Sequence, residues 1–212
     1  MRLFLSSVGV GSDQNQLPSF LGNTRNTLVI NNAMDLLSPQ SRFQFCTDGQ
    51  SYLEAIGLKV TELDLRKYFR NPSDLKKTLA SANLIWVRGG NVFVLRRAMK
   101  QSGFDQLLAP LLNEPNWAYG GDSAGALVLG PSLRGIESIE DPVTVPPEYD
   151  PEVIWDGLGL LPYSVLPHFQ SNHPASADVG RLARHFEESH RPYQTLRDGE
   201  VLIVDKKAPP SY

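Results

Sequence analysis

Short apolar runs alternate along the chain with stretches in which apolar residues recur at helical spacing. The runs predict buried strands at residues 3–8, 27–30, 58–65, 84–87, 117–119 and 158–165. The helical spacing falls at residues 33–37, 48–56, 71–82, 92–101, 104–112, 124–129 and 177–188. This alternation predicts an α/β protein with a mostly parallel central sheet. We expect residues 1–212 to form a single domain.

Two segments depart from the alternation. Residues 131–157 are rich in proline and acidic residues, which predicts a solvated surface loop, with a lid or a subunit contact as the alternatives. Further on, residues 193–196 and 201–204 flank an Asp-Gly pair at residues 198 and 199. That pair predicts a hairpin turn joining two short strands.

Composition narrows the classes of function. A net charge of −3 offers no basic face for nucleic acid, and no apolar run reaches the roughly 18 residues that span a membrane. Cys46 is the single cysteine, so neither an internal disulfide nor a Cys-rich metal site can form. We therefore expect a cytoplasmic protein that binds neither nucleic acid nor membrane.

The segment Gly121-Asp122-Ser123-Ala124-Gly125 fits the G-x-S-x-G pattern of a nucleophile elbow. An apolar strand precedes it and small apolar residues follow it, as a strand-to-helix turn requires. The serine hydroxyl would project above the sheet edge, and the N–H of Ala124 would face a developing oxyanion. The alternative is an ordinary turn in which Ser123 caps the helix.

A serine nucleophile needs a base, and the chain has four histidines. His168 follows an apolar strand and Pro167, so we expect it at the same sheet edge as Ser123. A partly buried histidine with a structural role is the open alternative. His173 lies in a polar loop and is expected at the surface or lining the pocket, whereas His185 and His190 are expected in solvent.

The base needs a carboxylate that orients it. Asp198 is the first candidate and Glu200 the second, while Asp122 is expected to line the site or cap the following helix. The order of serine, histidine and then carboxylate differs from the order in α/β-hydrolases, where the acid precedes the histidine. It therefore argues against that fold.

Four short segments together resemble the peptidase E family of serine peptidases, which includes α-aspartyl dipeptidases and is related to cyanophycinase. They occur in the family's order along nearly the whole chain. These segments are Gly89-Gly90-Asn91-Val-Phe-Val-Leu, Gly121-Asp-Ser123-Ala-Gly-Ala126, Leu166-Pro167-His168-Phe169 and Leu196-Arg197-Asp198-Gly199.

The resemblance implies a three-layer fold like that of class I glutamine amidotransferases, with no metal and no cofactor. It assigns Ser123 as nucleophile, His168 as base and Asp198 as the third member, where the family usually has glutamate. It also implies an oxyanion hole formed by the N–H groups of Gly90 and Ala124, with Gly89 as the fallback for the first. Residues expected to bind substrate are Gly89, Asn91, Asp122 and Arg181.

The resemblance also implies a preference for dipeptides with an N-terminal aspartate. Such a side chain needs a cation, and arginine is its natural bidentate partner. Arg181 is the first candidate, with Arg184 and Arg88 as alternatives, although the sequence around Arg181 does not closely copy the family's arginine motif.

Three hypotheses follow for the function. The first is a serine peptidase that cleaves small peptides. The second is an amidotransferase-like binding module that has lost turnover, and the third is a cyanophycinase-like or esterase activity that uses the same residues. A homodimer is possible in each case.

Overall fold

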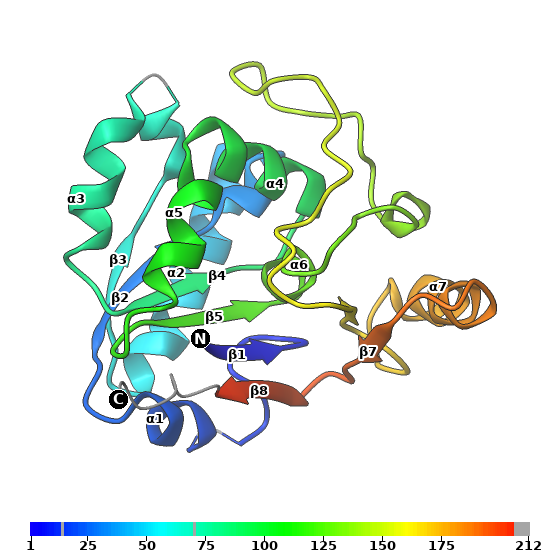
Figure 1. Cartoon of the computed structure of the whole chain (residues 1–212), viewed down its shortest axis with the longest axis horizontal. Helices are drawn as coiled ribbons and strands as arrows, with labels where there is room; N and C mark the ends of the chain where they lie inside the picture. Colours follow the sequence, from blue (N-terminus) through cyan, green and yellow to red (C-terminus); the bar gives the residue numbers. More distant parts are fainter. Residues whose placement is uncertain (14, 70, 206–212) are drawn as a thin grey trace, which may run out of the picture.

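The computed structural model describes residues 1–13, 15–69 and 71–205. Its central sheet has six strands in the order β3-β2-β4-β5-β1-β8 (Figure 1). The first five are parallel, and only β8 runs antiparallel, against β1. The strands are β1 (Arg2–Ser6), β2 (Asn26–Ile30), β3 (Lys59–Glu62), β4 (Leu84–Val87), β5 (Ala118–Asp122) and β8 (Val201–Asp205). The predicted α/β class with a mostly parallel sheet is confirmed.

Alternate residues of the strands enter two different apolar cores, one on each face of the sheet. Phe4, Val29 and Trp86 pack in a core with residues of α1 (Gln16–Leu21) and α2 (Pro39–Ala55). Leu5 and Val87 belong to the larger core, which contains residues of α3 (Leu75–Leu79), α4 (Val92–Gln101), α5 (Phe104–Leu111) and α6 (Ala124–Leu127). The result is the expected three layers.

The predicted hairpin at the end of the chain is wrong. β7 (Tyr193–Thr195) pairs with β6 (Ser164–Leu166) in a separate two-stranded parallel sheet, and α7 (Ser176–Glu188) connects them. Figure 1 shows α7 and β7 to one side of the central sheet. The turn itself forms, with Gly199 at φ +96°, but β8 leaves it to pair with five residues of β1. The β1–β8 ladder has five residue pairs, whereas a hairpin with the three-residue β7 could form three, so pairing with β1 is favoured.

The solvated loop predicted at residues 131–157 is also wrong. Leu133, Ile136 and Tyr149 of this segment are buried in the larger core. Arg97 of α4 is fully buried and donates hydrogen bonds to three carbonyls of the segment, those of Pro142, Pro151 and Glu152. The segment therefore packs over α4 as an ordered cover with one 3-10 turn, η4 (Ile136–Ser138).

The first third of the chain differs most from the predicted helices. α1 was not predicted, and α2 begins at Pro39, where Ser38 caps it by accepting a hydrogen bond from the N–H of Ser41. The apolar pattern hides this start because Phe43 and Phe45 are exposed. The remaining 3-10 turns are η1 (Asn32–Met34), η2 (Leu65–Tyr68) and η3 (Pro72–Asp74). The single-domain organisation stays a prediction.

Candidate active site

Ser123 lies at a sharp turn between β5 and α6, with φ +51° and ψ −114°. The neighbouring glycines allow this turn. A Cβ atom on Gly125 would lie 2.1 Å from the Val87 carbonyl oxygen, and one on Gly121 would lie 2.7 Å from the Gly125 oxygen. The Ser123 side chain makes no capping hydrogen bond, which contradicts the helix-cap alternative. The local geometry is that of a nucleophile elbow.

Three side chains meet at this turn from different parts of the chain. Ser123 Oγ lies 2.9 Å from Nε2 of His168, and His168 Nδ1 lies 2.8 Å from Asp198 Oδ1. His168 follows β6 in a left-handed conformation (φ +63°) and is 7% exposed. The structure thus brings together the serine, histidine and aspartate that the sequence singled out.

Ser7, at the end of β1, was not predicted as a site residue. Its hydroxyl donates to Asp198 Oδ1 at 2.6 Å and accepts the backbone N–H of His168 at 2.7 Å. Burial opposes ionisation of Asp198, but hydrogen bonds from Ser7 and His168 outweigh it and lower the pKa of Asp198. Asp198 is therefore ionised at neutral pH and can accept the histidine N–H. The position of Ser7 at the carboxyl end of a central strand was the available signal.

Glu200 does not reach His168. Its carboxylate accepts the backbone N–H of Arg197 at 2.8 Å and so closes its own turn. The structure places Asp198 beside the histidine, and the shorter aspartate is held there by Ser7 and by Ser171, whose hydroxyl accepts the Asp198 N–H.

His173 stacks on His168, with ring centroids 3.7 Å apart and planes 9° from parallel. It is half-buried rather than free in solvent, so it lines the pocket. Burial and the neighbouring charge of His168 lower the pKa of His173, although Asp198 opposes this. A neutral His173 therefore covers one face of the imidazole that would act as base.

Two backbone N–H groups beside Ser123 have no hydrogen-bond acceptor among the described residues, those of Gly90 and Ala124. Gly90 has φ +136°, and a Cβ there would lie 2.4 Å from the Ala33 carbonyl oxygen, so only glycine fits. The N–H of Gly89, the alternative donor, is not free, because it already donates a hydrogen bond to Asp122 Oδ2 at 3.3 Å. The N–H groups of Gly90 and Ala124 are therefore available as donors, and their assignment to an oxyanion hole stays a prediction.

Asp122 and Asn91 are both engaged by neighbouring groups. Asp122 is buried, accepts the indole N–H of Trp86 at 2.8 Å and lies 3.3 Å from Arg88 Nε. Burial raises the pKa of Asp122, with Arg88 and Trp86 opposing the shift. Asp122 does not cap α6, whereas Asn91 caps α4 through the N–H of Val94. Asp122 thus links the ends of β4 and β5 beside Ser123, and Asn91 orders the start of α4.

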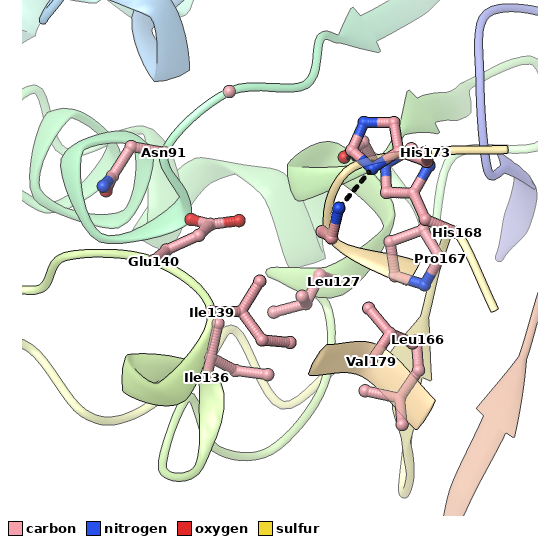
Figure 2. A pocket seen from close by; sticks show the side chains of 13 residues that line it. Asn91, Leu127, Ile136, Ile139, Glu140, Leu166, Pro167, His168, His173 and Val179 are labelled. Carbon is pink, nitrogen blue, oxygen red and sulfur yellow. Dashed lines mark hydrogen bonds between the residues drawn. The ribbon is translucent and has the colours of Figure 1, made fainter. Parts of the chain in front are cut away.

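Ser123 opens into two adjoining cavities of about 310 and 340 Å³. Both include Gly90, His168 and His173. The first, which we call the Glu140 cavity, is shown in Figure 2 and has otherwise mainly apolar walls. The second, which we call the Arg88 cavity, is lined by Arg88 and by apolar residues near the start of α2.

The sequence model of peptidase family S51 matches residues 13–209. The chain belongs to peptidase family S51. It is 27% identical over 159 residues to the uncharacterised peptidase Lin0382 of Listeria innocua. The alignment covers 75% of this chain and 72% of the Listeria protein. Peptidase E of Streptomyces coelicolor is 32% identical over 132 residues, and this alignment covers 60% of the present chain and 51% of the Streptomyces protein. A Drosophila melanogaster protein named as an alpha-aspartyl dipeptidase is 30% identical over 142 residues, with 64% and 55% covered.

Solved structures show the same fold. A crystal structure of a Listeria monocytogenes protein assigned to peptidase E superposes with a TM-score of 0.74 at 23% identity, covering 98% of both chains. The resemblance to peptidase E is thereby confirmed, and the chain is a serine-type peptidase. The three-layer arrangement is consistent with the class I glutamine-amidotransferase-like fold.

The S51 chain does not place Arg181 beside the nucleophile. Arg181 lies on α7, ion-paired with Asp178, and lines a separate cavity together with Arg184. Within the described ranges there is no cluster of three or more His, Cys, Asp or Glu suited to a metal ion. No helix in those ranges is long and apolar enough to cross a membrane.

Proposed function

We propose that this S51 peptidase hydrolyses small peptides through an acyl-enzyme formed on Ser123. The observation that carries the proposal is the unbroken hydrogen-bond chain from Ser123 through His168 to Asp198 at a nucleophile elbow. The family match supports the reaction class, and this geometry supports the assignment of roles.

In the proposed mechanism, His168 Nε2 takes the Ser123 proton as the oxygen attacks the substrate carbonyl carbon. The oxyanion then accepts hydrogen bonds from the N–H groups of Gly90 and Ala124. Asp198 stabilises the imidazolium, which gives its proton to the departing amine. Water enters by the same route, His168 removes a proton from it, and hydrolysis of the ester frees Ser123.

The size of the site supports small substrates. Cavities of about 310 and 340 Å³ meet at Ser123, and the ordered segment 131–157 supplies part of the wall of the first. This space suits a dipeptide or a short peptide better than a long chain. A homodimer and a cytoplasmic location stay predictions.

An N-terminal aspartate is the substrate side chain implied by the resemblance and by the name of the Drosophila relative. It requires a cation. Of the residues that line the two cavities at Ser123, Arg88 is the one arginine and there is no lysine, and Arg88 already faces Asp122. Binding of aspartate would therefore have to use Arg88.

The test is hydrolysis of Asp-Leu, Glu-Leu, Ala-Leu and Leu-Leu by the wild type and by Ser123→Ala, with the exposed Ser81→Ala as the matched control. We expect Ser123→Ala to lower kcat by about 10⁴-fold or more on every substrate that the wild type cleaves. Equal activity in Ser123→Ala would overturn the proposed mechanism. Absence of any turnover would favour a binding module, and cleavage of esters or β-linked aspartyl chains alone would favour the third hypothesis.

A further inference from the structure

Glu140 lies at the wall of the Glu140 cavity without a cationic partner. Its Oε2 accepts the N–H of Val92 at 2.5 Å, at the first turn of α4. No arginine or lysine among the described residues forms an ion pair with it. Figure 2 shows the carboxylate pointing into the cavity, across from the stacked His168 and His173. Burial raises the pKa of Glu140 to about 7, with the Val92 N–H opposing the shift, so a bound cation beside it would favour the ionised form and pair with it.

The other walls of the same cavity are apolar. They come from α6, η4 and the residue after it, β6 and α7, through Leu127, Ile136, Ile139, Leu166 and Val179. The ionisable side chains that line this cavity are Glu140, His168 and His173, with no arginine or lysine among the lining residues. The cavity therefore combines one acidic group with a surface suited to an uncharged side chain.

The chemistry of an N-terminal residue matches this arrangement. Its α-ammonium and its side chain are both attached to the carbon next to the carbonyl that Ser123 would attack. Both groups must therefore lie against the walls nearest Ser123. An ammonium would donate a charge-assisted hydrogen bond to the Glu140 carboxylate. An aspartate side chain would meet the charge of Glu140 and apolar walls, and its desolvation would go uncompensated.

We propose that the Glu140 cavity binds the N-terminal residue of a small peptide, with Glu140 pairing with the α-ammonium and the apolar walls receiving an uncharged, apolar side chain. This inference rests on the proposed function of Ser123. It names the substrate class as peptides with a free amino terminus and a residue such as leucine in first place. Glu140 is the specificity-determining residue.

The experiment compares leucine p-nitroanilide, aspartate p-nitroanilide and N-acetyl-leucine p-nitroanilide as substrates of the wild type, Glu140→Gln and Glu137→Gln. Glutamine keeps an oxygen that can accept the Val92 N–H, so the fold is preserved while the charge is lost. Glu137 is exposed in the same segment and serves as the matched control.

We expect the wild type to favour leucine over aspartate by at least about tenfold in kcat/KM. Glu140→Gln should raise KM for leucine p-nitroanilide by about 10- to 100-fold, with a smaller effect on the acetylated substrate. Glu137→Gln should behave as the wild type. A preference for aspartate, or equal losses on free and acetylated substrates, would overturn the inference.

Binding to Ser123→Ala separates this inference from the proposed function. Calorimetry with Leu-Leu and Asp-Leu measures recognition without turnover. Tighter binding of Leu-Leu, weakened when Glu140→Gln is added, would support the cavity assignment even if the wild type hydrolysed no substrate. Tighter binding of Asp-Leu would overturn it while leaving the role of Ser123 intact.

Discussion

Asp198 is the carboxylate that contacts His168, and in the proposed mechanism it orients the imidazole. Its carboxylate accepts the imidazole N–H and the hydroxyl of Ser7 through the same oxygen, Oδ1. Asp198→Asn keeps the volume but removes the charge that stabilises the imidazolium. We expect kcat to fall by about 10³- to 10⁴-fold, measured on the best dipeptide.

Glu200→Gln is the control for that substitution. Its side chain closes the Arg197 turn two residues away and does not touch His168. We expect kcat to stay within about twofold of the wild type. If Glu200→Gln lost activity and Asp198→Asn kept it, the carboxylate would have been assigned to the wrong residue.

For individual site residues, the sequence predicted those that belong to a local motif but not those that reach the site through long-range contacts. The G-x-S-x-G spacing singles out Ser123 because part of the steric restriction lies within the motif, as at Gly121, where a Cβ would lie 2.7 Å from the Gly125 oxygen. Ser7 joins the site from 161 residues before His168, and its role depends on β1 ending beside β6 and the last turn. The stacking of His173 on His168 likewise depends on the path of a loop that has no periodic pattern.

At the level of secondary-structure elements, α6 packs closely against β4 because residue 125 is a glycine and has no side chain. Gly125→Ala would bring a Cβ to 2.1 Å from a backbone carbonyl that cannot move easily. We expect a loss of about 3 kcal/mol in the free energy of unfolding, or failure to fold. Urea denaturation measures the change.

Gly180→Ala gives the matched comparison within α7. A Cβ at Gly180 would have no neighbour within 4 Å, so the helix should gain about 0.5–1 kcal/mol from the better propensity of alanine. Equal stability of the Gly125→Ala variant and the wild type would show that the elbow is less tightly packed than the structure indicates.

The cover formed by residues 131–157 depends on Arg97. Arg97→Met keeps much of the buried stem but removes the hydrogen bonds to three carbonyls of the segment. We expect the segment to lose about 3 kcal/mol of local stability and to be cleaved faster by a protease, while amides of the central sheet keep their exchange rates. KM should rise, because Ile139 and Glu140 of this segment line the cavity.

Lys100→Met, on the exposed side of the same helix, should leave the cleavage rate unchanged. Comparable cleavage in both variants would mean that other contacts hold the cover. The sequence could not reveal this contact, since proline-rich segments give no periodic signal and Arg97 reads as an ordinary helix residue. The strands β2 and β4 and the helix α4 were predictable because each buries a regular apolar pattern.

Across the whole molecule, a polar network ties the edge of the sheet to the cover. Tyr149 of the cover donates to Asp35 at 2.5 Å, and Arg66 lies between Asp35 and Asp64. Burial opposes ionisation of Asp64, but hydrogen bonds from Arg66 and Asn32 outweigh it and lower the pKa of Asp64 to about 2.

The lowered pKa of Asp64 makes the free energy of unfolding depend on pH. The unfolded chain binds this proton more tightly than the folded one, so the stabilisation is complete above about pH 4 and is lost as pH falls toward 2. Allowing for solvent screening, we expect a loss of about 1–2 kcal/mol. Asp64→Asn should remove this part of the acid dependence in urea titrations, and the exposed Asp74→Asn should not. An unchanged acid profile in Asp64→Asn would contradict the assignment.

The proposed mechanism depends on Ser123 being a nucleophile activated by His168 and Asp198. The most direct measurement is the mass of the intact protein after treatment with a fluorophosphonate that phosphonylates activated serines, followed by mapping of the modified peptide. We expect one adduct, located on Ser123, absent from Ser123→Ala and formed much more slowly in Asp198→Asn. Absence of an adduct from the folded wild type, or an adduct on another serine, would contradict the proposed mechanism.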